Sequence, residues 1–197
     1  MNKDTLRERR EKERRQKRIK MFLIIGGAVL AFSLLTGYLV WRENRPLPGE
    51  RVPVMANAAE HVAAGEDPGP FNSNPPSSGR HYGQPMEAGF YEENDPAAQV
   101  PHPEGYILHS LEHGYVVFWY NCQVLEEEDC SALKSEIRDV MDGFQNFKVI
   151  GFSWAEMDVP AALTSWGRIQ TFETFDPDLA RKFVQANRYQ APEPNAP

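Results

Sequence analysis

The residues with the clearest chemical potential are the five histidines, His61, His81, His102, His109 and His113. All of them lie in one stretch, which is otherwise rich in Gly, Pro, Asn and Ser. Imidazole is the commonest metal-binding side chain and titrates near neutral pH. The crowding therefore indicates either a metal site or a set of hydrogen bonds that stabilise loops, and both interpretations stay open at this point.

The segment HSLEH, residues 109–113, has the H-x-x-E-H spacing of inverted zinc peptidases, in which two histidines bind zinc and the glutamate is the base. That chemistry requires a helix, which brings positions i and i+4 onto one face. Here the string runs into GYVVFWY, whose β-branched and aromatic residues predict a strand. In an extended chain His109 and His113 would lie about 13 Å apart. A zinc-dependent hydrolase is therefore only an alternative, which needs a turn near Gly114.

A site shared between the loop region and this strand suits the histidines better. The expected metal ligands are His81, His109, His113, His61 and Met86. Glu112 and Tyr82 are expected to orient the ligands. Imidazole with a thioether favours copper, and zinc comes next. No nucleotide or organic cofactor is expected. In the competing interpretation the imidazoles only cap loops, and Glu112 orients one of the rings.

The two cysteines, Cys122 and Cys130, flank the connection between a predicted strand and a predicted helix. Their spacing differs from the C-x-x-C of thioredoxin-like redox sites. Outside the cytoplasm such a neighbouring pair is expected to oxidise. The sequence predicts a structural disulfide that stabilises the fold by roughly 2–3 kcal/mol.

The C-terminal half shows regular patterns of secondary structure. GYVVFWYN is apolar on both faces, as a buried central strand is. Residues 131–144 have helical spacing, and the acidic run before them suits a helix N-terminus. Two further strands are predicted at 148–157 and 164–175, and Asp176 with Pro177 opens a second helix. The order predicts an α/β (α+β) fold, a small two-layer sandwich with a long ordered Pro/Gly-rich loop region.

The charge is divided sharply along the chain. Residues 1–45 hold 12 of the 21 Lys/Arg and 5 of the 28 Asp/Glu, so residues 46–197 hold 9 and 23. Such an acidic body argues against binding to nucleic acid. Between the two parts, residues 21–41 carry no charge and are long enough to cross a bilayer as a helix. The basic end is expected in the cytoplasm and the acidic body outside the cell membrane.

A cleaved signal peptide is the rival explanation for the apolar run. No small-x-small cleavage site ends it, so an uncleaved single-pass anchor is favoured. The expected organisation is a basic cytoplasmic tail (1–20), a transmembrane helix (21–41), a linker (42–60), an extracytoplasmic α/β domain (61–190) and a flexible tail (191–197).

Long motifs in the acidic body resemble a known family. NPPSSGRHY and HSLEHG are similar to N-P-P-T-S-G-P-H-Y and H-S-L-E-H-G, the hallmark of bacterial membrane-anchored proteins catalogued as a domain of unknown function. The resemblance covers roughly residues 50–193 and implies a single-pass membrane protein without an established activity. Ser77 and Arg80 depart from the pattern. It carries over to Pro75, Pro76, Ser78, Gly79, His81, Tyr82, His109, Glu112, His113 and Gly114.

Three functions remain open on the sequence alone. The first is a membrane-tethered extracytoplasmic domain that binds a metal. The second is a non-catalytic interaction module that docks a membrane-protein partner. The third is the zinc-dependent hydrolase. The chain has no G-x-S-x-G elbow, P-loop or G-x-G-x-x-G fingerprint, so no catalytic residue is assigned.

Overall fold

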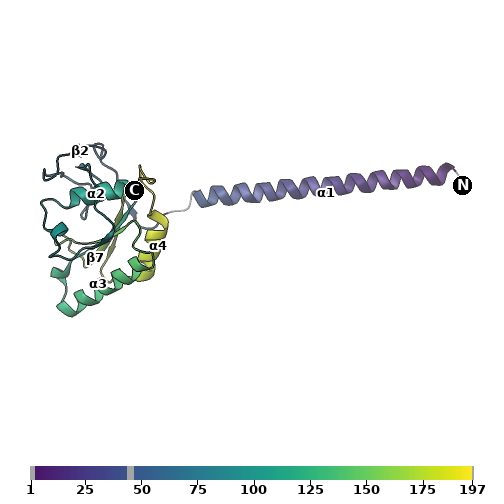
Figure 1. Cartoon of the computed structure of the whole chain (residues 1–197). Helices are drawn as coiled ribbons and strands as arrows, with labels where there is room; N and C mark the ends of the chain where they lie inside the picture. The colour runs from purple at the N-terminus through teal and green to yellow at the C-terminus, as the bar shows by residue number, and fades with distance from the viewer. Residues whose placement is uncertain (1–2, 44–46, 197) are drawn as a thin grey trace. The chain divides into compact units, whose positions relative to one another are not determined.

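The computed structural model describes residues 3–43 and 47–196, which divide between two units, Met1–Pro46 and Leu47–Pro197. The first unit consists of one helix, α1 (Lys3–Glu43) (Figure 1). Its segment Lys12–Trp41 is long and apolar enough to cross a membrane, and its place near the N-terminus fits an anchor or a signal sequence. The side chain of Ile24, for example, is 72% exposed.

The second unit is built on a six-stranded mixed sheet with the order β1-β8-β7-β5-β6-β4. The central strands are β5 (Val116–Tyr120), β6 (Val149–Ser153), β7 (Ala161–Ser165) and β8 (Arg168–Phe172). Two short strands, β1 (Glu50–Arg51) and β4 (Gly89–Phe90), form the edges. β5 is parallel to β6 and antiparallel to β7. The predicted buried central strand and the α/β class are thereby confirmed.

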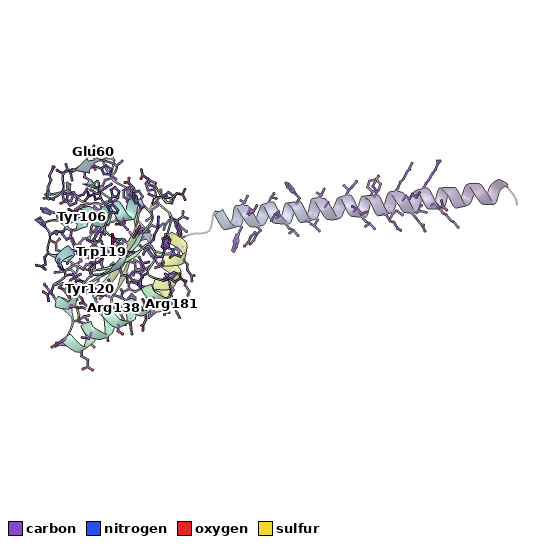
Figure 2. All side chains as sticks on the ribbon, viewed as in Figure 1. Glu60, Tyr106, Trp119, Tyr120, Arg138 and Arg181 are labelled. Carbon is purple, nitrogen blue, oxygen red and sulfur yellow. A yellow bond between two sulfur atoms is a disulfide. The ribbon has the colours of Figure 1, made fainter. Side chains whose placement is uncertain are left out.

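Helices cover both faces of the sheet. Side chains alternate along β5, so this strand contributes to the apolar core on each face. Val116, Phe118 and Tyr120 pack under α3 (Glu127–Asp142) and α4 (Pro177–Asn187). Val117 and Trp119 pack in a separate apolar cluster under α2 (Glu104–Glu112). In Figure 1, α2 lies on one side of the sheet and α3 and α4 on the other, and Figure 2 labels Trp119 and Tyr120 between them. The layer that contains α2 was not predicted.

The helical predictions for the C-terminal half are confirmed with shifted boundaries. α3 begins four residues before the predicted start, and the acidic residues Glu127, Glu128 and Asp129 form its first turn. Asp176 caps α4, because its Oδ1 accepts hydrogen bonds from the backbone of Asp178 and Leu179. Cys122 and Cys130 form the predicted disulfide between the 3-10 turn η2 (Cys122–Val124) and α3.

The segment 164–175 was predicted as one strand, and this was wrong. A tight turn at Trp166 and Gly167 divides it, and Gly167 has a φ of +67°, which a glycine adopts without strain. Ser165 on β7 pairs with Arg168 on β8 across this turn. The sequence pattern did not reveal β7 as a strand, because most of its side chains are small, although all five residues are buried.

HSLEH was interpreted as running into the following strand, whereas its first four residues lie in α2. The helix buries Ile107, Leu108 and Leu111 against the sheet, at a spacing of i, i+1 and i+4. It is only nine residues long, so its periodicity is easily lost beside the following strand. Gly114, with a φ of +83°, ends the helix and starts the turn into β5.

The ends of the second unit differ from the expected linker and flexible tail. β1, within the expected linker, pairs antiparallel with β8. At the other end, the backbone N–H of Glu193 donates to the carbonyl of Glu112, and Lys148 Nζ donates to the carbonyls of Pro194 and Ala196. Both segments therefore belong to the packed structure as far as it is described.

Candidate metal centre

Two of the histidines are brought together by a small separate sheet. β2 (His61–Val62) and β3 (His81–Tyr82) are parallel, and His61 and His81 are Cα partners. Partners in register lie on the same face of a sheet. The centroids of the two imidazole rings are accordingly 4.8 Å apart. A pairing between residues twenty positions apart thus forms half of the site.

The loop that delivers His81 is shaped by one asparagine. The side-chain oxygen of Asn72 accepts hydrogen bonds from the backbone N–H groups of Ser77 (3.1 Å) and Ser78 (2.8 Å). Its Nδ2 donates to Ser77 Oγ at 2.9 Å. Ser77 and Ser78 are fully buried, so the Pro/Gly-rich segment is an ordered loop, as predicted.

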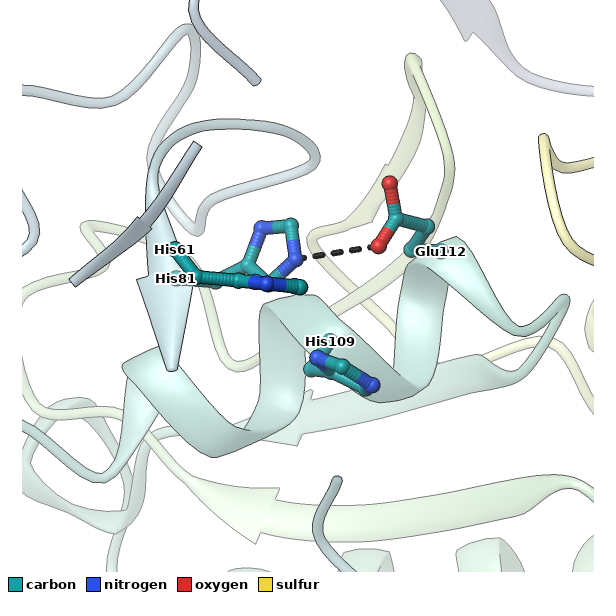
Figure 3. A group of neighbouring side chains, drawn as sticks. All are labelled: His61, His81, His109 and Glu112. Carbon is teal, nitrogen blue, oxygen red and sulfur yellow. Dashed lines mark hydrogen bonds and ion pairs between the residues drawn. The ribbon is translucent and has the colours of Figure 1, made fainter. Parts of the chain in front are cut away.

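The other half of the site comes from α2. His109 and Glu112 are three positions apart, so they lie one helical turn apart on the same side. Figure 3 shows them on α2, with His61 and His81 reaching the same space from the short strands. One ligand atom from each of these four residues lies within 4.8 Å of every other. We call His61, His81, His109 and Glu112 the histidine cluster.

Backbone carbonyls determine how two of the rings are oriented. Nδ1 of His81 lies 3.0 Å from the carbonyl oxygen of Gly79, and Nδ1 of His109 lies 2.7 Å from that of Tyr82. A carbonyl oxygen only accepts, so Nδ1 carries the proton in both rings and donates it. In the neutral tautomer Nε2 of each ring then keeps a lone pair that can bind a metal. Metal-ligating histidines in proteins are typically held in this way.

A carboxylate faces the first of these lone pairs. Nε2 of His81 is 3.0 Å from Oε2 of Glu112, and both side chains are buried, at 0% and 8% exposure (Figure 3). Two acceptors at this distance require a cation between them. A proton fulfils this requirement in the metal-free protein, and a metal ion bound by both groups fulfils it equally well.

The imidazole of His109 is electrically neutral at physiological pH. The pKa of His109 is lowered to about 4, chiefly by burial and in part by the nearby imidazoles of His113, His81 and His61, against the hydrogen bond to Tyr82. Neutral imidazole is the form that binds metal. The cluster therefore does not have to release a proton from His109 before it binds a cation.

The remaining predicted ligands lie outside the histidine cluster. His113 follows α2, and its ring centroid is 4.4 Å from that of His109, but its Nε2 is directed to Glu193 Oε2 at 3.7 Å. The two histidines of HSLEH are thus close, as they would not be in an extended segment. His113 nevertheless is not among the four residues whose ligand atoms converge.

Met86 lies in the apolar cluster between α2 and the sheet. Its backbone is held to α2 by one hydroxyl group: the N–H donates to Ser110 Oγ, and the carbonyl accepts a hydrogen bond from it. His102, which was not predicted as a ligand, pairs with Glu104 at 3.4 Å. Neither residue is part of the histidine cluster.

Sequence reasoning assigned Glu112 and Tyr82 supporting roles. Tyr82 acts through its carbonyl on His109, while a carboxylate oxygen of Glu112 lies within 4.8 Å of a ring nitrogen of each histidine in the cluster. The contribution of Gly79 was missed, because a backbone acceptor leaves no mark in a sequence. Trp166 was missed as well, although its ring stands edge-on to His81 with a centroid distance of 6.3 Å.

A second group of potential ligands, Glu93, Cys122 and Cys130, lies at the other end of β5. Its two sulfur atoms are joined in the disulfide, and Glu93 accepts a hydrogen bond from Lys134 Nζ at 2.8 Å. Sulfur binds metals as thiolate. In the oxidised protein this group therefore has a structural role.

The model of one protein family matches residues 61–197, and its description is "Protein of unknown function (DUF3105)". The match includes all four residues of the histidine cluster. No curated protein and no solved structure matches the chain.

Proposed function

This chain belongs to the DUF3105 family of proteins of unknown function, and we propose that it is a membrane-anchored domain that binds a transition-metal ion outside the cytoplasm. The metal ligands in this proposal are His61, His81, His109 and Glu112. The apolar helix α1 is its anchor.

The observation that carries the proposal is the paired orientation of His81 and His109. Each donates Nδ1–H to a backbone carbonyl, which leaves Nε2 of the neutral ring with a lone pair for a metal, and Nε2 of His81 faces Glu112. Histidines that only cap loops would use whichever nitrogen lies nearest an acceptor. Here backbone carbonyls hold Nδ1 of both rings, and the two residues converge with a third imidazole and a carboxylate. This is the arrangement of ligands and supporting hydrogen bonds expected around a bound metal.

The donor set fits a divalent ion of the copper and zinc type. Imidazole suits both metals, and zinc also accepts carboxylate oxygen. Bonds of about 2.1 Å in a tetrahedron place ligand atoms about 3.4 Å apart. Separations of up to 4.8 Å therefore have to contract by as much as about 1.4 Å when the metal binds. We place copper first, because sites of nitrogen and oxygen donors bind Cu²⁺ more tightly than Zn²⁺. Met86 is not needed for this argument.

His61 is the exposed member of the cluster, whereas the other three residues are buried. It stands on a two-residue strand within the loop region. A metal ion therefore enters and leaves the site past His61. We infer that the domain receives or delivers its metal there, in exchange with a membrane-protein partner.

The charge distribution supports the proposed topology. Ten Lys/Arg precede the apolar run, and residues 46–197 carry a large excess of acidic side chains. By the positive-inside rule, this places the N-terminus in the cytoplasm and the acidic unit outside. The disulfide between Cys122 and Cys130 agrees with an oxidising compartment.

Elemental analysis of the purified full chain in mild detergent tests the metal proposal directly. We expect about one equivalent of copper or zinc per chain after loading and dialysis. The variants His81→Gln and His109→Gln should lose it. His102→Asn is the matched control, because His102 has a φ of +50°, which asparagine tolerates, and lies outside the cluster.

The outcomes separate the alternatives. Metal retained by His109→Gln, or absent from the wild type after loading, would contradict the proposal. In the second case the histidines are structural, and an interaction module becomes the better explanation. The absorption spectrum of the copper form gives an independent readout, because it responds to the ligands and not to the fold alone.

The topology is tested with right-side-out membrane vesicles. External protease should remove residues 47–197 and leave an N-terminal epitope protected. A mature protein that lacks α1 by mass spectrometry would show instead that the helix is a cleaved signal sequence.

A further inference from the structure

Two arginines stand opposite each other at the edge of the main sheet. Arg51 on β1 and Arg168 on β8 are Cα partners in the antiparallel ladder. Like charges directly opposite on neighbouring strands repel each other. Residues 46–197 contain nine Lys/Arg and 23 Asp/Glu, so most charged residues of this unit are acidic. Two arginines as direct partners are therefore unexpected in it. The placement of two arginines side by side therefore calls for a compensating charge.

No carboxylate among the described residues 47–196 supplies that charge. Within residues 47–196, neither Arg51 nor Arg168 forms an ion pair with a carboxylate. Nη1 of Arg168 donates to the carbonyls of Leu47 and Gly49, at 3.3 and 3.2 Å. Glu50 lies next to Arg51, but side chains alternate along a strand, so it belongs to the opposite face.

The arginines line a pocket of about 320 Å³. This volume is at the small end of the range for ligand sites. Arginine presents a planar fork of N–H donors, which matches carboxylate and phosphate oxygens. Besides Val54 and Gly167, the pocket is lined by Arg51, Val52, Pro53, Trp166, Arg168 and Gln190.

We propose that this pocket is a binding site for an oxyanion, a phosphate or carboxylate group, held between Arg51 and Arg168. Gln190 adds an amide donor, and Trp166 supplies an apolar wall. The same indole ring stands edge-on to His81, so the oxyanion site adjoins the histidine cluster. The two sites use different residues, and the oxyanion site does not depend on metal binding.

The oxyanion has two plausible sources with the same chemistry. One is a free phosphate or carboxylate compound, and the other is the phosphate of a phospholipid headgroup. The experiment therefore uses the full chain in two settings, with a chelator present in both. In neutral detergent, inorganic phosphate and acetate are titrated by calorimetry against chloride at equal ionic strength. In nanodiscs, phosphatidylcholine alone is compared with phosphatidylcholine plus phosphatidylglycerol, and the unfolding temperature is measured.

A free oxyanion predicts saturable phosphate or acetate binding in detergent. Arg51→Gln should weaken it by about tenfold or more, since it removes charge-assisted hydrogen bonds. A lipid headgroup predicts a higher unfolding temperature in the phosphatidylglycerol discs, which Arg51→Gln abolishes. The control is Arg181→Gln, which removes the same charge from α4, where Arg181 pairs with Asp178 at 3.1 Å (Figure 2). It should behave as the wild type in both settings.

Arg168→Lys tests the second arginine. If this variant unfolds, the variants of the exposed Arg51 still test the proposal. Arg51→Lys should bind more weakly than the wild type but better than Arg51→Gln, because it keeps the charge and loses the fork. Absence of saturable binding in detergent together with equal unfolding temperatures in the two discs would overturn the proposal. Binding that Arg51→Gln leaves unchanged would overturn it equally.

Discussion

At the scale of single residues, the histidine cluster depends on a contact between two residues that are not proposed as ligands, Tyr82 and Gly105. The carbonyl of Tyr82 orients His109, and the ring of Tyr82 packs on α2 over Gly105. A Cβ at position 105 would lie 2.5 Å from Cε2 of Tyr82, which is 1% exposed and has no room to move. The absence of a side chain at Gly105 therefore helps to position a proposed metal ligand.

We expect Gly105→Ala to destabilise the protein. Alanine gains about 1 kcal/mol in helix propensity, but overpacking against Tyr82 costs roughly 1–3 kcal/mol. The displaced carbonyl should also weaken metal binding through His109. Urea unfolding and metal titration measure the two effects. The control is Gly83→Ala, where a Cβ meets no atom within 4 Å, and equal behaviour of the two variants would contradict the argument.

At the scale of elements, an ion-pair group connects the segment after β4 to α3. Lys134 Nζ donates to Glu92 Oε2 at 2.7 Å, and Arg138 donates to Oε1 of the same carboxylate. Burial alone would raise the pKa of Glu92, but the hydrogen bonds and charges of Lys134 and Arg138 outweigh it and hold the pKa below its ordinary value of 4.5. A carboxylate with a lowered pKa in the folded state stabilises the fold while it is ionised.

This contribution is present above pH 4.5 and is lost as the pH falls through the lower pKa of the folded state. We therefore expect Glu92→Gln to be less stable than the wild type at neutral pH, with a difference that disappears in acid. Urea unfolding across this pH range measures it. Glu87→Gln removes an exposed carboxylate without a salt bridge and should show no such trend. A difference for Glu92→Gln that is independent of pH would contradict the prediction.

The disulfide joins two further elements, η2 and α3, across eight positions of sequence. Closing so short a loop restricts the unfolded chain, by about 2.5 kcal/mol on the chain-entropy model. We expect the double variant Cys122→Ser/Cys130→Ser to lose about this much unfolding free energy. The variant should still bind metal, because the cysteines lie at the opposite end of β5 from the histidine cluster. Loss of metal together with the disulfide would contradict this separation.

At the scale of the whole molecule, the two units have different surfaces. α1 exposes large apolar side chains, whereas the unit from Leu47 has two apolar clusters of its own on the two faces of its sheet. We expect residues 47–197 to be soluble and to unfold cooperatively without α1. Size-exclusion chromatography and circular dichroism test this. Aggregation of this fragment, with the disulfide intact, would show that its fold needs the anchor.

The sequence by itself determined the features that depend on local composition and periodicity. The uncharged run 21–41 predicts a helix that suits a membrane, the apolar run at 115–120 predicts a buried strand, and Asp176 with Pro177 marks the start of a helix. The disulfide followed from two cysteines near each other in the chain. Each of these signals lies within about twenty residues, so a single sequence contains them in full.

Only the tertiary structure decided how the histidines meet. His61, His81 and His109 are widely separated along the chain, and their meeting depends on the pairing of β2 with β3 and on the packing of α2. The helical state of HSLEH is itself set by burial of one apolar face against the sheet, which overrides its weak local signal. The opposition of Arg51 and Arg168 likewise follows from strand register. Contacts between distant segments depend on the packed core, and a local pattern does not encode them.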